Sequence, residues 1–291
     1  MSEGVRRTGP ADLKASVRDY WNANPCGTDL TDLNDAERYS RAYFDAIEEE
    51  RYRLEPEIFS FAQFTRHRGE RVLEVGVGAG TDFTQWVRAG AVAHGIDLTP
   101  EGVEHVRRRL AVYGLEAEEV RVADCEALPY PDGHFDLVYS WGVIHHTPGT
   151  EQALHEIIRV LRPGGTAKVM VYHRHSLFAF LLWVRRALLA GRPWRSLAWC
   201  VWDIESPGTK AYTRRELRRM LDGQPVTDVR IATHLTWNER QGLSPSRIRR
   251  AIGSALARFA GDRAGWFMTL ELTRVGGPPE RSAAAGQDPS A

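Results

Sequence analysis

A glycine-rich stretch between residues 74 and 81 has the composition of a loop that brings its backbone close to a ligand. It reads Glu-Val-Gly-Val-Gly-Ala-Gly-Thr, with Gly76, Gly78 and Gly80 at alternate positions. Glycine allows positive φ and a close approach of a ligand to the main chain, and the amides of a helix that starts there face the ligand. Gly80 stands one residue before the place that the dinucleotide fingerprint requires, which Thr81 occupies. The loop therefore predicts a ligand site without specifying a dinucleotide.

Two aspartates end later β-like runs and strengthen this prediction. Asp97 ends one run and follows Gly78 by 19 residues, a distance at which an acidic side chain can accept hydrogen bonds from ribose hydroxyls. Asp124 ends the next run, where a carboxylate could accept from an exocyclic amino group such as that of adenine. Parallel strands carry their ligand sites at their carboxyl ends. A nucleoside-containing ligand is the prediction, and a simple turn aspartate is the alternative for Asp124.

His145 and His146 follow the fourth β-like run at the same edge. A histidine with a pKa near 6.5 can take a proton at neutral pH, so either residue could act as a general base or position a substrate. A structural cap of the strand end is the alternative. A metal site is not expected, because adjacent side chains of an extended strand point to opposite sides.

Aromatic and polar side chains near this edge are further candidates. Tyr172 and His173 end the fifth β-like run, and Tyr212 precedes a helix that begins near Thr213. Substrate contact and a purely structural role in a wall or turn are both open for these three residues. Tyr20 lies in an N-terminal helical segment, where it could shield a cation with its ring or pack inside a helical cap.

The elements that position these residues are short β-like runs that alternate with helical stretches. The runs cover residues 71–77, 91–98, 118–125, 135–142 and 166–172, and two late runs read TDVRIATHL and GWFMTLELTRV. This alternation predicts a parallel α/β sheet with helices on both faces. We expect a helical cap over 11–66 and a main domain over 67–275. Gly-, Pro-, Ser- and Ala-rich composition predicts disorder over 1–10 and 276–291.

An apolar stretch over residues 176–190 interrupts this pattern. It is about 15 residues long and includes Arg185 and Arg186, whereas a membrane span needs about 20 apolar residues. We expect it to start a helical lid insertion over about 176–212. A face for an apolar substrate or for a membrane surface is the alternative. The N-terminus has no apolar segment of the signal-peptide kind.

The composition excludes several classes of protein. The 38 Lys and Arg residues balance the 38 Asp and Glu residues, which disfavours a strongly basic nucleic-acid binder. A hydrophobic content of 43% excludes disorder of the whole chain. Cys26, Cys125 and Cys200 form no CxxC pair and cannot make a disulfide-dense scaffold. We expect reduced thiols, a cytoplasmic location and no bound metal.

Four stretches in register resemble the class I S-adenosylmethionine-dependent methyltransferases. They are VLEVGVGAGTD, GIDLTP, ADCEALPYPDGHFDLVYSWGVIHHTP and EIIRVLRPGG. The sequence is most similar to the subgroup that includes the ubiquinone and menaquinone methyltransferases and many small-molecule methyltransferases. The resemblance is strong over about residues 66–172. It implies a Rossmann-like seven-stranded sheet of order 3-2-1-4-5-7-6, with strand 7 antiparallel.

The resemblance also implies roles for individual residues. Those that would contact S-adenosylmethionine are Gly76, Gly78 and Gly80 near the methionine part, Glu74 holding backbone amides beneath the loop, Asp97 on the ribose, Asp124 and the Cys125 backbone on the adenine, and Leu98 on the adenine face. Trp141 would line the methyl-transfer site, and the N-terminal segment with Tyr20 would close over the cofactor.

The expected function is thus methyl transfer to a small molecule, with the oxygen of a natural product as the favoured acceptor. A peptide, an RNA, or a lipid or quinone acceptor is the alternative, as is a catalytically silent cofactor-binding partner protein. A nicotinamide-dependent oxidoreductase is disfavoured, because it would need the full GxGxxG and leaves Asp124 without a role. The sequence indicates no oligomeric state.

Overall fold

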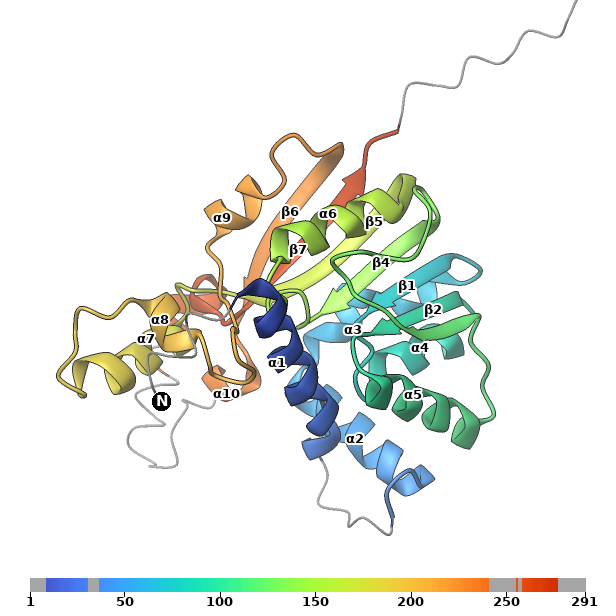
Figure 1. Cartoon of the computed structure of the whole chain (residues 1–291), viewed down its shortest axis with the longest axis horizontal. Coiled ribbons are helices and arrows are strands. Elements are labelled where there is room, and N and C mark those ends of the chain that lie inside the picture. Colours follow the sequence, from blue (N-terminus) through green and yellow to red (C-terminus); the bar gives the residue numbers. More distant parts are fainter. Residues whose placement is uncertain (1–8, 31–36, 241–254, 256–257, 277–291) are drawn as a thin grey trace, which may run out of the picture.

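The structure is a computed structural model that describes residues 9–30, 37–240, 255 and 258–276. Its centre is a seven-stranded sheet of order β3-β2-β1-β4-β5-β7-β6 (Figure 1). The strands are β1 (Arg71–Val75), β2 (Val92–Asp97), β3 (Glu119–Val122), β4 (Phe135–Trp141), β5 (Leu161–Tyr172), β6 (Val226–His234) and β7 (Phe267–Arg274). The first five are parallel, and β7 runs antiparallel to β5 and β6. The predicted Rossmann-like sheet is confirmed. The stretches predicted to be disordered lie almost wholly outside the described residues.

Helices cover both faces of this sheet. Side chains of α6 (Thr150–Val160) and α9 (Arg214–Arg219) join one core cluster with the strands. Side chains of α3 (Glu57–Ala62), α4 (Thr81–Ala89) and α5 (Pro100–Tyr113) join the cluster on the other face. The side chain of Thr99 caps α5 by accepting from the amide of Gly102, so the helix begins directly after β2 and its loop. This short connection places the end of β2 beside the glycine loop.

The segment before β1 is helical, as its sequence pattern indicates. It holds α1 (Pro10–Ala23), the 3₁₀ turn η2 (Thr28–Leu30), α2 (Arg41–Leu54), α3 and the 3₁₀ turn η3 (Phe64–His67). Pro25 follows the end of α1, and Pro56 separates α2 from α3, in keeping with the loss of a backbone donor at proline. Residues near the end of α1 contribute to a cavity at the carboxyl edge of the sheet.

A lobe between β5 and β6 is formed by α7 (Leu177–Trp183), the π-helical turn η4 (Val184–Leu188) and α8 (Leu197–Val201), at the left of Figure 1. Two short elements complete the described chain, α10 (Trp237–Arg240) and the 3₁₀ turn η5 (Gly261–Ala264). Within the described ranges, no helix combines the length and the apolar character that crossing a bilayer requires.

Strand β5 begins five residues earlier than the sequence pattern indicates. Leu161 pairs with Phe135, and the pairing then jumps to Thr166 opposite Leu137. The residues in between form a bulge in which Gly164 has a φ of 79°. These added residues, which precede the run expected over 166–172, include an Arg-Pro-Gly-Gly sequence that is more typical of a helix terminus.

Candidate functional site

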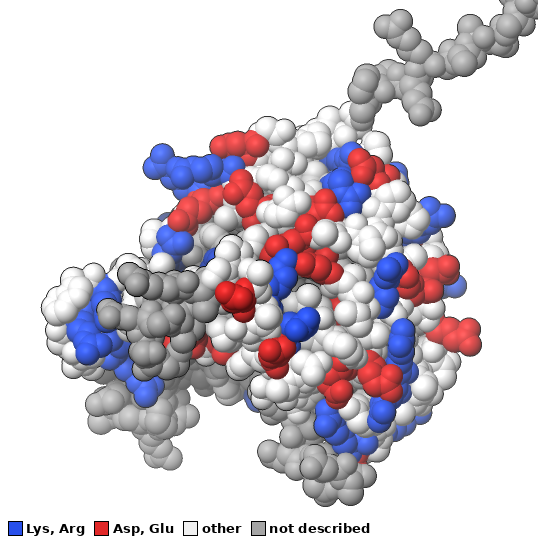
Figure 2. Space-filling model, in the orientation of Figure 1, with Lys and Arg blue, Asp and Glu red and all other residues white. Residues whose placement is uncertain are grey.

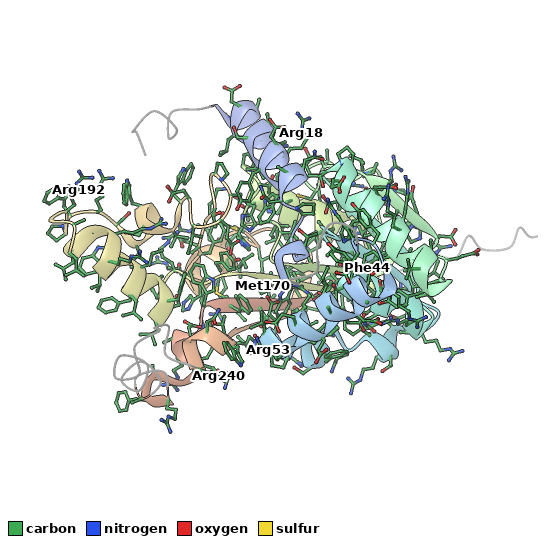
Figure 3. The ribbon with its side chains drawn as sticks, turned by 90° about the horizontal axis from the view of Figure 1, so that it is seen from below. Arg18, Phe44, Arg53, Met170, Arg192 and Arg240 are labelled. Carbon is green, nitrogen blue, oxygen red and sulfur yellow. The ribbon has the colours of Figure 1, made fainter. Side chains whose placement is uncertain are left out.

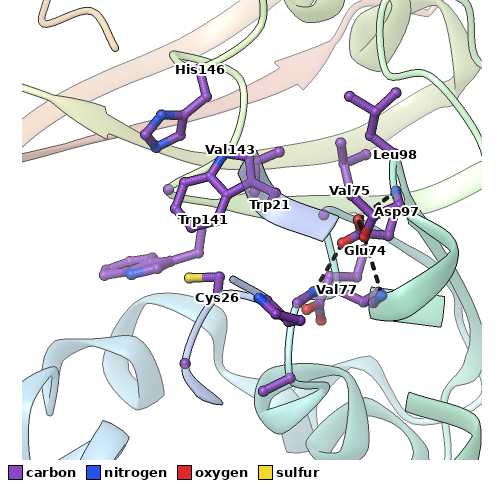
Figure 4. A pocket seen from close by; sticks show the side chains of 18 of the residues that line it. Trp21, Cys26, Glu74, Val75, Val77, Asp97, Leu98, Trp141, Val143 and His146 are labelled. Atoms are coloured by element: carbon purple, nitrogen blue, oxygen red, sulfur yellow. Dashed lines mark hydrogen bonds between the residues drawn. The ribbon is translucent and has the colours of Figure 1, made fainter. Parts of the chain in front are cut away.

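A cavity of about 550 Å³ lies where the loops after β1, β2, β3 and β4 meet the N-terminal segment. This size is within the range of small-molecule sites in proteins, which is roughly 300–1,000 Å³. Figure 4 shows Asp97 and Leu98 on one side of the cavity and His146 on the other. The predicted site residues that line it are Tyr20, Glu74, Gly76, Gly78, Asp97, Leu98, Asp124, Cys125, Trp141, His146 and Tyr172.

The glycine loop depends on the absence of side chains. Gly76 has a φ of 79°, and a Cβ added there would lie 2.3 Å from Cγ2 of Val143. A Cβ on Gly78, at a φ of 49°, would lie 3.1 Å from the carbonyl oxygen of Cys26. Gly80 caps the N-terminus of α4 and lies against Val106 of α5. It is not among the residues that line the cavity, so its expected contact with the cofactor stays a prediction.

The Asp97 carboxylate connects the loops that follow β1 and β2. Its Oδ2 accepts from the amide of Gly78 at 3.1 Å, and its Oδ1 accepts from the amide and hydroxyl of Thr99 at 2.9 and 2.8 Å. Burial raises the pKa of this carboxyl group. Asp97 thus lines the cavity with both oxygens fixed in direction. An aspartate in this setting can accept further hydrogen bonds from ligand hydroxyls.

Asp124 is held by a lysine that the sequence analysis did not identify. Lys14 of α1 contacts Oδ2 of Asp124 at 2.6 Å and Oε2 of Glu126 at the same distance. Oδ1 of Asp124 accepts from the amide of Glu126 at 2.9 Å. The ion pairs attach α1 to the loop after β3, so this helix closes one side of the cavity. Burial raises the pKa of the neighbouring Cys125 thiol to about 12, which keeps it protonated.

The resemblance implies that Glu74 holds backbone amides of the glycine loop, but in the structure its carboxylate has a different partner. Its carboxylate accepts from the indole nitrogen of Trp86 at 2.9 Å. The residue is 3% exposed, and burial, followed by repulsion from Asp82, raises the pKa of its carboxyl group well above its usual value. The loop amide of Gly78 instead donates to Asp97.

A buried ionic cluster from α2 and α4 forms another wall of the cavity. Arg51 donates to both oxygens of Asp82, through Nε at 3.2 Å and Nη2 at 3.0 Å. Its Nη1 lies 3.6 Å from Oε2 of Glu55, and that carboxylate accepts from the indole of Trp141 at 2.7 Å. All four residues line the cavity. The sequence analysis identified only Trp141, because no local pattern marks a helix that packs against a distant loop.

The opposite end of the cavity holds an aromatic and acidic group. Tyr172 donates to the Glu205 carboxylate at 2.7 Å, and Nε2 of His146 lies 3.4 Å from the same carboxylate. The ring of His146 also contacts that of Trp21 edge to face, with centroids 5.2 Å apart. The sequence analysis missed Glu205, although it considered Tyr212 in the segment that follows. The signal that could have found it is its place as one of two acidic residues, with Asp203, that directly follow a Trp-rich segment.

The two adjacent histidines differ from their expected arrangement. Residues 142–149 form a turn instead of extended strand, so the two rings lie together with centroids 4.2 Å apart. His145 is completely buried and does not line the cavity. Burial, with repulsion from His146 and Lys210, lowers its pKa well below 6.5. Burial lowers the pKa of His146 to about 3. Neither ring matches the expectation of a base with a pKa near 6.5.

His173 and Tyr212 do not line the cavity. They form a β-bridge with each other, and Nδ1 of His173 lies 3.1 Å from the carbonyl oxygen of Gly265. Both side chains are buried. Their contacts therefore connect β5, the loop before α9 and the loop before β7, and their expected role in substrate binding has no support from this position.

Lowering the pH should destabilise the folded protein, because His146 is neutral in the folded state and is protonated more readily in the unfolded state. Its pKa is about 3 in the folded protein, against roughly 6.5 for an unperturbed histidine. The folded state therefore binds fewer protons than the unfolded state below pH 6.5. The stability associated with the neutral ring is present above that pH and is lost as the pH falls. Between pH 7 and pH 5 the loss is about 2 kcal/mol, because the unfolded-state pKa sets it while the folded-state pKa stays below 5.

Urea unfolding of the wild type and of His146→Asn at pH 7 and pH 5 measures this loss. Asparagine can keep a hydrogen bond to Ser206, which lies 2.9 Å from Nδ1 of His146, but has no titrating ring. The wild type should lose about 2 kcal/mol more than the variant, and His175→Asn at an exposed position is the matched control. Identical pH dependence of the wild type and His146→Asn would contradict the assignment.

Among the described residues, no three His, Cys, Asp or Glu side chains are grouped in a way that could hold a metal ion. The site is therefore described by its glycine loop, its two strand-end aspartates and its aromatic and acidic end.

Comparison with known proteins gives this geometry a family context. Residues 73–169 match the model of a family described as a methyltransferase domain. An uncharacterized protein of Mycobacterium tuberculosis is 35% identical over 167 residues, which are 57% of this chain and 57% of that protein. A fatty-acid O-methyltransferase of Mycolicibacterium smegmatis is 34% identical over 163 residues, 55% of this chain and 53% of that protein. The chain thus spans somewhat more than half the length of these relatives.

A solved structure supports the fold over a longer range. The geranyl diphosphate C-methyltransferase of Streptomyces coelicolor aligns with 90% of this chain and 98% of its own, with a TM-score of 0.60 and 15% sequence identity. Residues 73–169 thus match a methyltransferase-domain family, and they lie in a chain whose seven-stranded fold is similar to that of a solved methyltransferase.

Proposed function

We propose that this protein transfers a methyl group from S-adenosylmethionine to a hydroxyl oxygen of a small molecule. The observation that carries the proposal is a cavity that joins two chemically different ends. One end has the glycine loop with Asp97 and Asp124, and the other has Tyr172 and Glu205 among aromatic rings. A nucleoside cofactor and an acceptor can therefore meet inside one continuous cavity.

The residues at the first end fit S-adenosylmethionine. The half-buried Asp97 carboxylate faces the cavity with a fixed orientation and would bind the ribose hydroxyls. A Cβ at Gly102 would lie 2.8 Å from the Asp97 carboxyl carbon. The absence of a side chain at Gly102 therefore leaves room for the aspartate in this orientation. Asp124, Leu98 and the Cys125 backbone would surround the adenine.

The glycine loop and Arg51 would surround the methionine part. Arg51 lies beside Thr81 and Asp82 at the start of α4, where helix amides also favour an anion. When bound, the cofactor supplies an electrophilic methyl group on a sulfonium centre. The protein contributes alignment and exclusion of water. Tyr20 and Trp21 of α1, whose rings contact each other edge to face at 5.0 Å, would cover the bound cofactor.

The second end favours a hydroxyl acceptor. A hydroxyl group can donate its proton to the Glu205 carboxylate, which is already oriented by the hydroxyl of Tyr172 at 2.7 and 2.9 Å. Neutral His146 lies 3.4 Å from that carboxylate and is held by Ser206, so it acts as a positioning residue. Glu205 is the proposed general base.

The fatty-acid O-methyltransferase of M. smegmatis supports transfer to oxygen, but its carboxylate acceptor does not suit this cavity. An ionised carboxylate would face Glu205, with Glu55 on the same cavity wall as Trp141, and like charges at such distances repel. We therefore place the acceptor among alcohols and phenols, including those of specialised metabolism. The narrower resemblance to ubiquinone and menaquinone methyltransferases stays a prediction.

Mass spectrometry of reactions with matched acceptors tests this proposal. Purified protein and S-adenosylmethionine are incubated with pairs of aromatic and aliphatic molecules that differ only in carrying a hydroxyl, a carboxylate or an amine. We expect a methylated product from a hydroxyl member. Glu205→Gln should then lower the rate by roughly a hundredfold, while the affinity for S-adenosylhomocysteine stays within about threefold of the wild type.

Glu104→Gln, at an exposed position of α5, is the control and should leave the rate unchanged. The loss in Glu205→Gln should shrink as the pH approaches the pKa of a phenolic acceptor, because the acceptor then ionises without help. Methylation of the carboxylate members alone would contradict the choice of acceptor. Cofactor binding without any product would favour a silent binding protein instead.

A further inference from the structure

The lobe between β5 and β6 has a composition that the cavity does not explain. Residues 177–202 contain four arginines and no aspartate or glutamate, which leaves 34 basic and 38 acidic residues in the remainder of the chain. The same 26 residues hold four of the nine tryptophans, Trp183, Trp194, Trp199 and Trp202. A locally cationic and Trp-rich segment therefore projects from a body with a net negative charge.

The tip of this lobe, formed by residues 188–194, exposes large apolar side chains. Leu189 is 78% exposed, Trp194 is 77% exposed and Leu188 is 46% exposed. Phe180 of α7, 51% exposed, stacks on Trp183 with ring centroids 6.0 Å apart. Isolated exposed apolar residues are ordinary, but contiguous ones at a projecting tip mark an interaction surface.

The arginines of the lobe divide into two groups. Arg186 pairs with Asp203 at 2.7 Å, and Arg195 lies over the ring of Trp199 at 3.6 Å. Arg185 and Arg192 are exposed and make no ion pair within the part of the chain that the structure describes. Figure 3 shows Arg192 at the far end of the lobe, directed away from Met170 in the sheet. In Figure 2, blue side chains lie among white ones on this lobe.

We infer that this tip binds the surface of an anionic lipid bilayer. Leucine and tryptophan side chains can enter the boundary between headgroups and acyl chains, while arginines beside them contact anionic headgroups. Each basic residue close to such a surface raises the partition coefficient roughly fivefold. The absence of acidic residues over 177–202 removes the repulsion that would oppose this contact. Charge complementarity thus selects an anionic membrane over a neutral apolar partner.

The lobe also connects this surface to the cavity. Helices α7 and α8 pack on each other, and Glu205, which lines the cavity, follows α8 closely in the chain. The lobe therefore carries the exposed tip at its far end, and the chain that leaves α8 supplies Glu205 to the acceptor end of the cavity. The inference does not depend on the proposed methyl transfer, since binding to lipid is measured without cofactor or acceptor.

Sedimentation with vesicles tests the inference on the full chain. One set of vesicles is phosphatidylcholine alone, and the other contains about one third phosphatidylglycerol. We expect binding to the anionic vesicles, at least about tenfold weaker binding to the neutral ones, and a decrease with added salt. Arg185→Glu/Arg192→Glu should lower the partition coefficient at least about tenfold. Leu189→Ala/Trp194→Ala should lower it comparably.

Arg218→Glu/Arg219→Glu is the matched control, because it changes the charge equally at exposed positions of α9. It should bind anionic vesicles at least about tenfold more tightly than Arg185→Glu/Arg192→Glu, and circular dichroism checks that each variant is folded. Equal binding by the two double arginine variants would overturn the inference. So would the absence of wild-type binding to anionic vesicles, or a wild-type dimer that Leu189→Ala/Trp194→Ala dissociates without any lipid binding. That last result would assign the tip to a second copy of the chain.

Discussion

Replacing Gly76 with alanine is expected to destabilise the protein by about 2–5 kcal/mol. The new Cβ would lie 2.3 Å from Cγ2 and 2.6 Å from Cγ1 of Val143, and such overpacking typically costs roughly 1–3 kcal/mol. The backbone φ of 79° adds roughly 1–2 kcal/mol for a residue with a side chain. Urea unfolding measures the total, which is large against the usual net stability of a domain.

Two further variants separate the steric and backbone contributions. Gly114→Ala has a similar φ of 64° with nothing within 4 Å of the added Cβ, so it should cost only about 1–2 kcal/mol. Val143→Ala, alone and combined with Gly76→Ala, completes a double-mutant cycle. The cycle should show that the two substitutions are coupled, because the shortened side chain at 143 makes room. Additive effects, or equal costs at Gly76 and Gly114, would be inconsistent with the contact.

Removing Arg51 is expected to cost about 3–5 kcal/mol, because it leaves the buried carboxylate of Asp82 without a cation. Asp82 is 3% exposed and, among the residues that the structure describes, would retain the hydroxyl groups of Tyr52 and Tyr139, at 3.2 and 3.0 Å. Arg51→Met keeps most of the apolar length of the side chain. Its free energy of unfolding, measured with urea, should fall by that amount, and Arg51→Met/Asp82→Asn should recover much of the loss.

The same helix provides a control for this prediction. Arg53 pairs with Glu50 at the surface, where the two side chains are 48% and 33% exposed. An exposed pair contributes little to stability, so Arg53→Met should have a small effect. Equal losses in Arg51→Met and Arg53→Met would show that the Arg51–Asp82 pair is not buried in the way described. Failure of the Asp82→Asn rescue would count against an unpaired charge as the cause.

The sequence predicts those residues of the site whose positions follow from the order of the strands. Gly76, Asp97 and Asp124 lie at or just after the carboxyl ends of parallel strands of one sheet, and the topology brings such positions to one edge. Their roles are therefore visible once the alternation of strands and helices and the family resemblance are established. The sheet order itself came from the resemblance, since local patterns specify strands without specifying their neighbours.

The remaining residues of the site are positioned by packing between elements that are distant in the chain. Lys14 contacts Asp124 across 110 residues, and the hydroxyl of Tyr172 reaches Glu205 across 33. No local periodicity predicts such contacts, because they depend on where α1 and the lobe fold back over the sheet. The predicted arrangement of His145 and His146 was wrong for a related reason. A turn after β4 replaces the extended strand that was assumed, so His145 enters the core while His146 faces the cavity.

Calorimetric titration with S-adenosylhomocysteine tests the central claim most directly. The wild type should bind one equivalent. Asp97→Asn should bind about 10- to 100-fold more weakly, because a hydrogen bond to a charged group contributes roughly 1.5–3 kcal/mol. Asp132→Asn, at a side chain that is 70% exposed, should bind as the wild type does. The absence of binding by the wild type, or equal affinity of the wild type and Asp97→Asn, would contradict the claim that this cavity holds the methyl donor.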